Sequence, residues 1–115
     1  GGMNVDITIT NNESFAMSGW VIGFEIDRMV SSFWRAKEVS GSYDAQFAFA
    51  APDWQNDIAP GESFTFGVQF AGGSELLENL RLLEANGTPI PEPVASGIGL
   101  SLSALLALLR RKRHL

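Results

Sequence analysis

The sequence predicts an all-β protein, an antiparallel β-sandwich of the immunoglobulin-like or jelly-roll type, followed by a C-terminal hydrophobic helix. Two observations predict the sandwich. Short segments alternate apolar and polar residues with a period of two, the pattern of a strand with one buried face. Turn-forming residues separate these segments at short intervals, as in sandwiches of antiparallel strands. A long uncharged run near the C-terminus predicts the helix.

The alternating segments follow one another along residues 1–89. The first, residues 4–10, puts Val5, Ile7 and Ile9 on one face and Asp6 and Thr8 on the other. The later segments place on one face Trp20, Ile22, Phe24 and Ile26, then Phe47 and Phe49, then Phe64, Phe66, Val68 and Phe70. The turns between them are Asn11-Asn12, Ser40-Gly41-Ser42, Asn56-Asp57, Pro60-Gly61 and Gly72-Gly73.

One segment after these strands fits two structures. Leu76, Leu77, Leu80 and Leu83 follow Ser74 at spacings that also suit a short amphipathic helix with a serine cap. We expect a connecting loop or a turn of helix here, and then a strand near residues 80–85.

Charge is divided sharply along the chain. Residues 1–93 carry thirteen acidic and four basic side chains, a net charge of −9, whereas residues 110–113 carry a charge of +4. So acidic a surface argues against nucleic acid as a partner. The chain has no cysteine, which excludes disulfides and thiolate metal sites.

The uncharged run covers the sixteen residues from Val94 to Leu109. As a helix it would be about 24 Å long, close to the roughly 30 Å of a bilayer core if the following basic side chains extend it. We therefore expect a transmembrane helix at 94–109, with residues 1–93 on the far side from the basic cluster. The alternative, an amphipathic helix packed on the domain, needs a polar face that Ser96, Ser101 and Ser103 hardly supply.

The order of parts in this tail resembles the PEP-CTERM sorting signal of Gram-negative bacteria. Its parts are the triplet Pro91-Glu92-Pro93, the apolar run and the cluster Arg110-Arg111-Lys112-Arg113. The resemblance implies that residues 90–115 are a sorting tail, which holds an exported protein in the inner membrane until an exosortase-type enzyme processes it. The protein would then reach the cell surface or extracellular matrix.

The sequence offers little for catalysis. Its single histidine, His114, lies in the tail, and without cysteine no histidine- or cysteine-based triad is available. Asp53 and Asp57 flank Trp54, but a loop on a small sandwich provides no deep cleft to raise a carboxyl pKa for glycoside hydrolysis. A calcium site from Asp53, Asp57 or Glu62 matches no specific motif. We expect no enzyme activity, no cofactor and no metal.

The three tryptophans stand in different contexts. Trp20 begins an apolar stripe, which predicts a core position. Trp34 and Trp54 lie among polar and turn residues, which predicts partial exposure, and exposed flat aromatic side chains suit stacking on sugar rings. The alternative for each is that it covers an edge of the core.

The motifs of residues 1–89 resemble the family 2 carbohydrate-binding modules, bacterial β-sandwiches that bind cellulose and xylan. They are, in order, ITITNN, SGW, FEI, VSSFW, APDWQNDIAPGESFTFGVQF and NGTP. The resemblance implies that Trp34 and Trp54 are two of three coplanar surface aromatics and that Trp20 is buried. It places polar residues that hydrogen-bond sugar hydroxyls near Asp6, Ser32 and Thr65.

The sequence departs from this family in several ways. The family's first strand and first surface tryptophan would precede Gly1, so we expect the true start of the chain to lie upstream. The two cysteines that often join the ends are absent, and Asp6 and Ser32 stand where the family commonly has amides. Two tryptophans that each bury about 100 Å² contribute about 5 kcal/mol gross. Association costs at least about 4 kcal/mol, so binding should be weak.

The leading hypothesis is a non-catalytic module that binds a cellulose- or xylan-like β-glycan on an exported, surface-sorted protein. A structural spacer or matrix protein that binds no glycan is one alternative. A targeting module of a glycoside hydrolase whose catalytic domain lies elsewhere is another.

Overall fold

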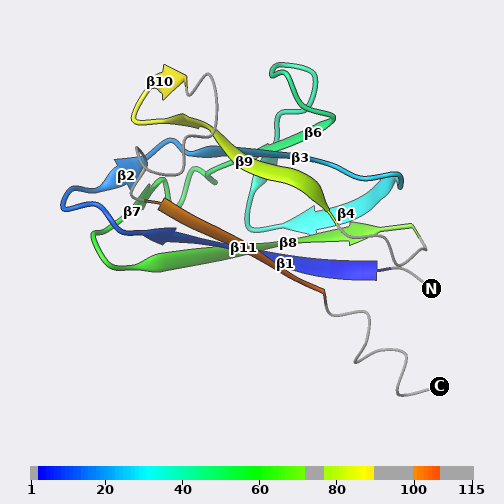
Figure 1. Cartoon of the computed structure of the whole chain (residues 1–115), viewed down its shortest axis with the longest axis horizontal. Helices are drawn as coiled ribbons and strands as arrows, with labels where there is room; N and C mark the ends of the chain where they lie inside the picture. Colours follow the sequence, from blue (N-terminus) through cyan, green and yellow to red (C-terminus); the bar gives the residue numbers. More distant parts are fainter. Residues whose placement is uncertain (1–2, 72–76, 90–99, 107–115) are drawn as a thin grey trace.

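The structure is a computed structural model that describes residues 3–71, 77–89 and 100–106 (Figure 1). These residues form strands joined by turns and loops, with no helix among them. The strands are β1 Met3–Asn11, β2 Met17–Ser18, β3 Val21–Glu25, β4 Val30–Trp34, β5 Lys37–Glu38, β6 Phe47–Ala50, β7 Asp57–Ile58, β8 Ser63–Phe70, β9 Glu78–Ala85, β10 Thr88–Pro89 and β11 Leu100–Leu106.

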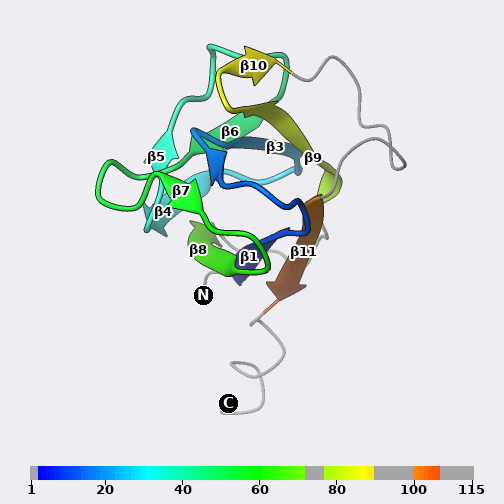
Figure 2. The ribbon, with the colours of Figure 1, turned by 90° about the vertical axis from the view of Figure 1, so that its left-hand side faces the viewer.

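The strands form two main sheets that lie face to face, which confirms the predicted antiparallel sandwich (Figure 2). The first sheet has the order β11-β1-β8-β4 and the second the order β10-β9-β3-β6-β5. All neighbouring strands are antiparallel. A short third pair, β2 with β7, connects the loops at one end of the sandwich.

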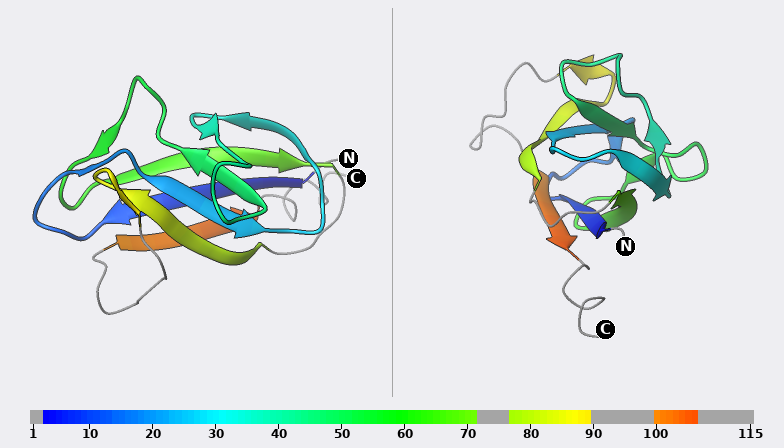
Figure 3. Two further views of the ribbon diagram at one scale, coloured as in Figure 1. Left: turned by 90° about the horizontal axis from the view of Figure 1, so that it is seen from above. Right: turned by 90° about the vertical axis from the view of Figure 1, so that its right-hand side faces the viewer.

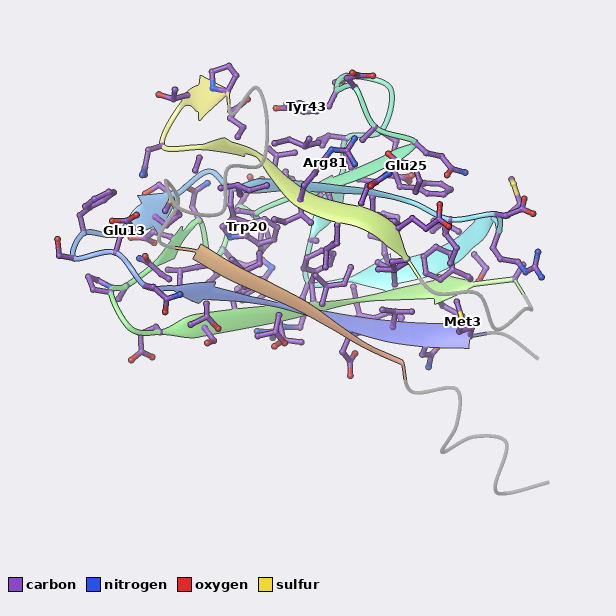
Figure 4. All side chains as sticks on the ribbon, in the orientation of Figure 1. Met3, Glu13, Trp20, Glu25, Tyr43 and Arg81 are labelled. Atoms are coloured by element: carbon purple, nitrogen blue, oxygen red, sulfur yellow. The ribbon has the colours of Figure 1, made fainter. Side chains whose placement is uncertain are left out.

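The core lies between the two sheets and is rich in aromatic side chains. Trp20 is fully buried there, stacks on Phe66 with ring centroids 5.5 Å apart, and also contacts Phe64 (Figure 4). Strands β1 and β8 alternate inward and outward as their sequences predict, and their inward side chains are buried. These are Met3, Val5, Ile7 and Ile9 on β1 and Phe64, Phe66, Val68 and Phe70 on β8.

The ambiguous segment after β8 forms a strand where the structure describes it. Strand β9 runs from Glu78 to Ala85 and pairs with β3, with Glu84 opposite Val21. This confirms the expected strand near residues 80–85. Leu82 is buried and Leu80 packs partly against the core. Cross-strand pairing with β3 therefore decides between the two periods that the leucine spacing allowed.

The predicted tail helix is wrong for residues 100–106, which form β11 along the outer edge of β1 (Figure 3). The helix prediction counted hydropathy and missed the period-two pattern Leu-Ser-Leu-Ser-Ala-Leu-Leu, which suits a strand with one apolar face. The open edge of β1 then supplies backbone partners for this strand. The remaining predicted helix residues, the Pro-Glu-Pro triplet and the basic cluster lie outside the described residues. Within the part of the chain that the structure describes, no helix could span a membrane.

Candidate functional site

The outer face of the first sheet carries a continuous polar surface with one tryptophan. Register places outward residues of the three strands side by side: Ser32 opposite Gln69, Trp34 opposite Gly67, and the β8 residues opposite those of β1. We use the name outer face for the outward residues Asn4, Asp6, Thr8, Thr10, Ser32, Trp34, Ser63, Thr65, Gly67 and Gln69. Seven of these residues, together with the carboxylate Asp6, carry polar side chains suited to hydrogen bonding with hydroxyl groups.

Trp34 lies flat against β8 because its neighbour there is glycine. A Cβ atom at Gly67 would be 2.2 Å from Trp34 Cε2, so no other residue could leave the indole in this position. Trp34 is 39% exposed, and the register partner of Gly67 on the other side is Asp6. Trp34 and Asp6 therefore lie in one row across the sheet, with the backbone of Gly67 between them.

Trp54 projects from the loop between β6 and β7 and is 62% exposed. Its ring contacts Phe64 with centroids 5.8 Å apart. The Arg35 guanidinium lies 5.0 Å from the Trp54 ring centroid and 4.8 Å from that of Phe64, within the range of a cation–π contact. Arg35 Nε also donates a hydrogen bond to the carbonyl oxygen of Thr65, 2.9 Å away. The guanidinium is therefore positioned both by the aromatic rings and by this hydrogen bond.

Two asparagines brace the loop that carries Trp54. The Gly19 backbone N–H donates to the carbonyl and side-chain oxygens of Asn56, at 3.1 and 2.9 Å. Asn11 is fully buried, and its Nδ2 donates to the carbonyl oxygens of Ile58 at 2.8 Å and Phe15 at 2.9 Å. The loop is thus tied down after Trp54, at Asn56 and at Ile58.

The structure brings four of the five predicted binding residues onto the outer face, and the fifth, Trp54, lies beside Phe64 in the loop between β6 and β7. Asp6, Ser32 and Thr65 all lie on the outer face with Trp34, and Thr65 Oγ1 shares a 2.8 Å hydrogen bond with Thr8 Oγ1. The predicted exposure of Trp34 and Trp54 and the predicted burial of Trp20 are confirmed.

The sequence analysis missed three residues at this site. Asn4 and Gln69 are register partners on the outer face. They provide amide side chains close to Asp6 and Ser32, the two positions where the family commonly has amides. The alternation of β1 and β8 already placed them there, two residues from Asp6 and from Gly67. Arg35 was also missed, because its place over Trp54 depends on a left-handed backbone conformation with φ of 67°.

A shallow depression of about 430 Å³ lies beside the base of the Trp54 loop. Its lining residues are Gln55, Asp57, Ile58, Ala59, Pro60, Glu62, Ser63 and Phe64. Phe64 also contacts Trp54, so the depression and the aromatic site share one residue.

One carboxylate beside Trp54 is paired with a lysine. Asp53 forms a 2.8 Å ion pair with Lys37, and its side chain is 88% exposed. Among the described residues, no group of three histidine, cysteine or acidic side chains is placed so that it could hold a metal ion.

Comparison with known proteins identifies the family. Residues 1–88 match the model of the cellulose binding domain family CBM_2. The chain belongs to this family. Because family members are non-catalytic carbohydrate-binding domains, residues 1–88 are a binding module and not a catalytic domain.

Two longer proteins contain similar segments. Endo-1,4-beta-xylanase A of Cellvibrio japonicus is 39% identical over 69 residues, which is 59% of this chain and 11% of that enzyme. A solved structure, chitinase ChiA74 from Bacillus thuringiensis, matches with a TM-score of 0.60 and 25% identity over 70% of this chain and 13% of that one. The chain thus spans a small fraction of each protein.

Proposed function

We propose that the module binds an extended β-linked glycan of the cellulose or xylan type through Trp34 and Trp54. The observation that carries this proposal is that both indoles are exposed and rest against the same strand, Trp34 at Gly67 and Trp54 at Phe64 of β8. Gly67 and Phe64, against which they rest, are three positions apart on β8, about 10 Å along the strand, with Gly67 on the outer face and Phe64 on the inner face. That spacing suits two stacking positions along one sugar chain, since flat aromatic rings pack against the apolar faces of sugar rings.

Polar residues of the outer face would then bind the hydroxyl groups of the chain. Asp6, Ser32 and Thr65 flank the row of Trp34, and Asn4 and Gln69 extend it with amides. Because Trp34 and Trp54 are the two exposed tryptophans among the described residues, their gross contribution of about 5 kcal/mol barely exceeds the cost of association. The proposed binding is therefore weak and depends on both tryptophans.

The proposed setting is an exported protein displayed at the surface of a Gram-negative cell. The resemblance of residues 90–115 to a sorting signal supports this setting, with exosortase-type processing near Pro91-Glu92-Pro93 and temporary anchoring in the inner membrane. The cation cluster Arg110-Arg111-Lys112-Arg113 would keep the end of the tail cytoplasmic.

A second candidate function is a targeting module that holds a glycoside hydrolase on its substrate. The names of the two matched proteins, a xylanase and a chitinase, favour this candidate. In both cases the module attaches a larger assembly to a polysaccharide, and the same tryptophans would carry the attachment.

Depletion of the chain from solution by insoluble cellulose, xylan and chitin tests this function. We expect retention on at least one polymer, and we expect Trp34→Ala and Trp54→Ala each to reduce it strongly, because each removes one of two platforms. Phe15→Ala is the matched control, because Phe15 is 53% exposed but lies in the loop between β1 and β2. Retention of neither the original chain nor the control on any polymer would favour the spacer alternative.

A further inference from the structure

The outer edge of β1 is covered by the chain's own tail. Seven consecutive residues of β11 pair with β1, from Leu106 opposite Val5 to Leu100 opposite Asn11. An edge strand that is long and regular, such as β1, presents a row of backbone N–H and C=O groups able to accept another strand. In this structure β11 occupies that row (Figure 3).

The tail sequence follows the apolar and polar alternation of β1 at five of the seven register positions, the other two being Leu105 opposite Asp6 and Leu100 opposite Asn11. Val5, Ile7 and Ile9 are fully buried, and their register partners are Leu106, Ala104 and Leu102. On the other face, Thr8 and Thr10 have Ser103 and Ser101 as partners. The sequence therefore has apolar residues at the register positions of the buried residues Val5, Ile7 and Ile9, and serines at those of Thr8 and Thr10. A slip of one residue would reverse this match.

The same seven residues form the centre of the uncharged run Val94–Leu109, which the proposed anchor requires in full. Sixteen residues already give a helix shorter than a typical bilayer core, so a span that lacks residues 100–106 is not feasible. One segment cannot pair with β1 and cross a membrane at the same time.

We propose that the edge of β1 is a strand-accepting surface for the tail segment Leu100–Leu106, and that tail docking competes with membrane insertion. The second part rests on the proposed anchoring role of the tail, whereas the first rests on the pairing alone. In water the tail segment pairs with the edge of β1. At a bilayer the tail leaves, and the β1 edge opens.

Engineered cysteines test the docking, because the natural chain has none to interfere. The pair Thr8→Cys/Ser103→Cys joins register partners on the outer face, where cross-strand Cβ atoms are about 5 Å apart. The control pair Asp6→Cys/Ser101→Cys has the same strands and face but is four positions out of register, about 13 Å. We expect mild oxidation of the full chain to close the first pair and leave the second reduced. Equal closure of both pairs, or failure of the first, would overturn the docked strand.

Vesicles of phosphatidylcholine with phosphatidylglycerol test the competition separately. We expect the reduced Thr8→Cys/Ser103→Cys chain to associate with them, and the oxidised chain to fall to the level of a chain lacking Pro91–Leu115. If the oxidised and reduced chains associate equally, competition is refuted while docking stands. If the reduced and natural chains both fail to associate, the anchoring role falls and the competition with it, but cross-linking still decides whether the tail docks.

Discussion

Gly67 decides where one of the two exposed tryptophans can lie. The Trp34 indole occupies the space that a side chain at position 67 would fill, with three ring atoms within 2.3 Å of the Cβ position. Gly67 does not have a positive φ, so its backbone conformation would accept alanine without strain. Any effect of a substitution there must therefore act through Trp34.

We predict that Gly67→Ala weakens glycan retention about as much as Trp34→Ala does. Displacing Trp34 removes a stacking contact of about 2.5 kcal/mol gross, or roughly 70-fold in affinity. The melting temperature should change little, because the indole is displaced toward solvent and the core is untouched. The control is Gly67→Ala in the Trp34→Ala background, where a double-mutant cycle should show no additional loss. Independent, additive losses from the two substitutions would contradict the account.

At the scale of single residues, sequence context predicted which tryptophans are exposed but not which neighbouring residues hold them in place. The polar and turn residues around Trp34 and Trp54 were enough to predict exposed rings, and the apolar stripe was enough to bury Trp20. The packing of Trp34 on Gly67 was not predictable because it depends on the pairing of β4 with β8. The position of Arg35 over Trp54 was not predictable because it depends on the left-handed backbone conformation of Arg35.

Among the elements, β3 and β9 are joined by a partly buried ion pair (Figure 4). Arg81 lies 3.2 Å from Glu25 Oε2, and Asn79 Nδ2 donates to Glu25 Oε1 at 2.9 Å. Arg81 also donates to the carbonyl oxygen of Asp44 at 2.7 Å, which fixes the loop before β6. Partial burial alone would raise the pKa of Glu25, but the hydrogen bonds from Arg81, Asn79 and the Gln46 backbone together with the Arg81 charge lower it.

This ion pair predicts that stability falls in acid. The folded pKa of Glu25 is below its ordinary value of 4.5, so the unfolded chain binds the proton more tightly. The contribution of Glu25 is complete above pH 4.5 and is lost as the pH falls through the lower folded pKa. Urea unfolding at a series of pH values from neutral to acid should show this loss, and Glu25→Gln should flatten it. A Glu25→Gln chain with the same pH profile as the original would refute the assignment.

Element prediction succeeded where the periodic pattern and burial agree. Strands β1 and β8 alternate strictly and were predicted from the sequence, whereas the leucines before β9 fit two periods and only pairing with β3 decided between them. The tail failed because its hydropathy suggested a helix while its alternation suited a strand, and no local signal reveals the open edge of β1.

For the whole molecule, the two sheets have separate tasks. The first sheet has a buried inner face and the polar outer face with Trp34, while the second closes the core from the other side (Figure 2). Strand order places the loop of Trp54 beside the start of β8, so residues from three distant parts of the sequence meet in one site. A net charge of −9 on residues 1–93 suits a neutral glycan better than an anionic one.

The central claim is that glycan contacts Trp34 and Trp54 together and leaves Trp20 untouched. Its most direct test is an NMR titration of the ¹⁵N-labelled chain with cellohexaose and, separately, xylohexaose, observed at the three indole N–H resonances. We predict that the Trp34 and Trp54 resonances shift together with one weak dissociation constant, while the Trp20 resonance stays in place because that ring is fully buried. If neither exposed indole shifts with either sugar, or if Trp20 alone responds, the outer face is not the glycan-binding site.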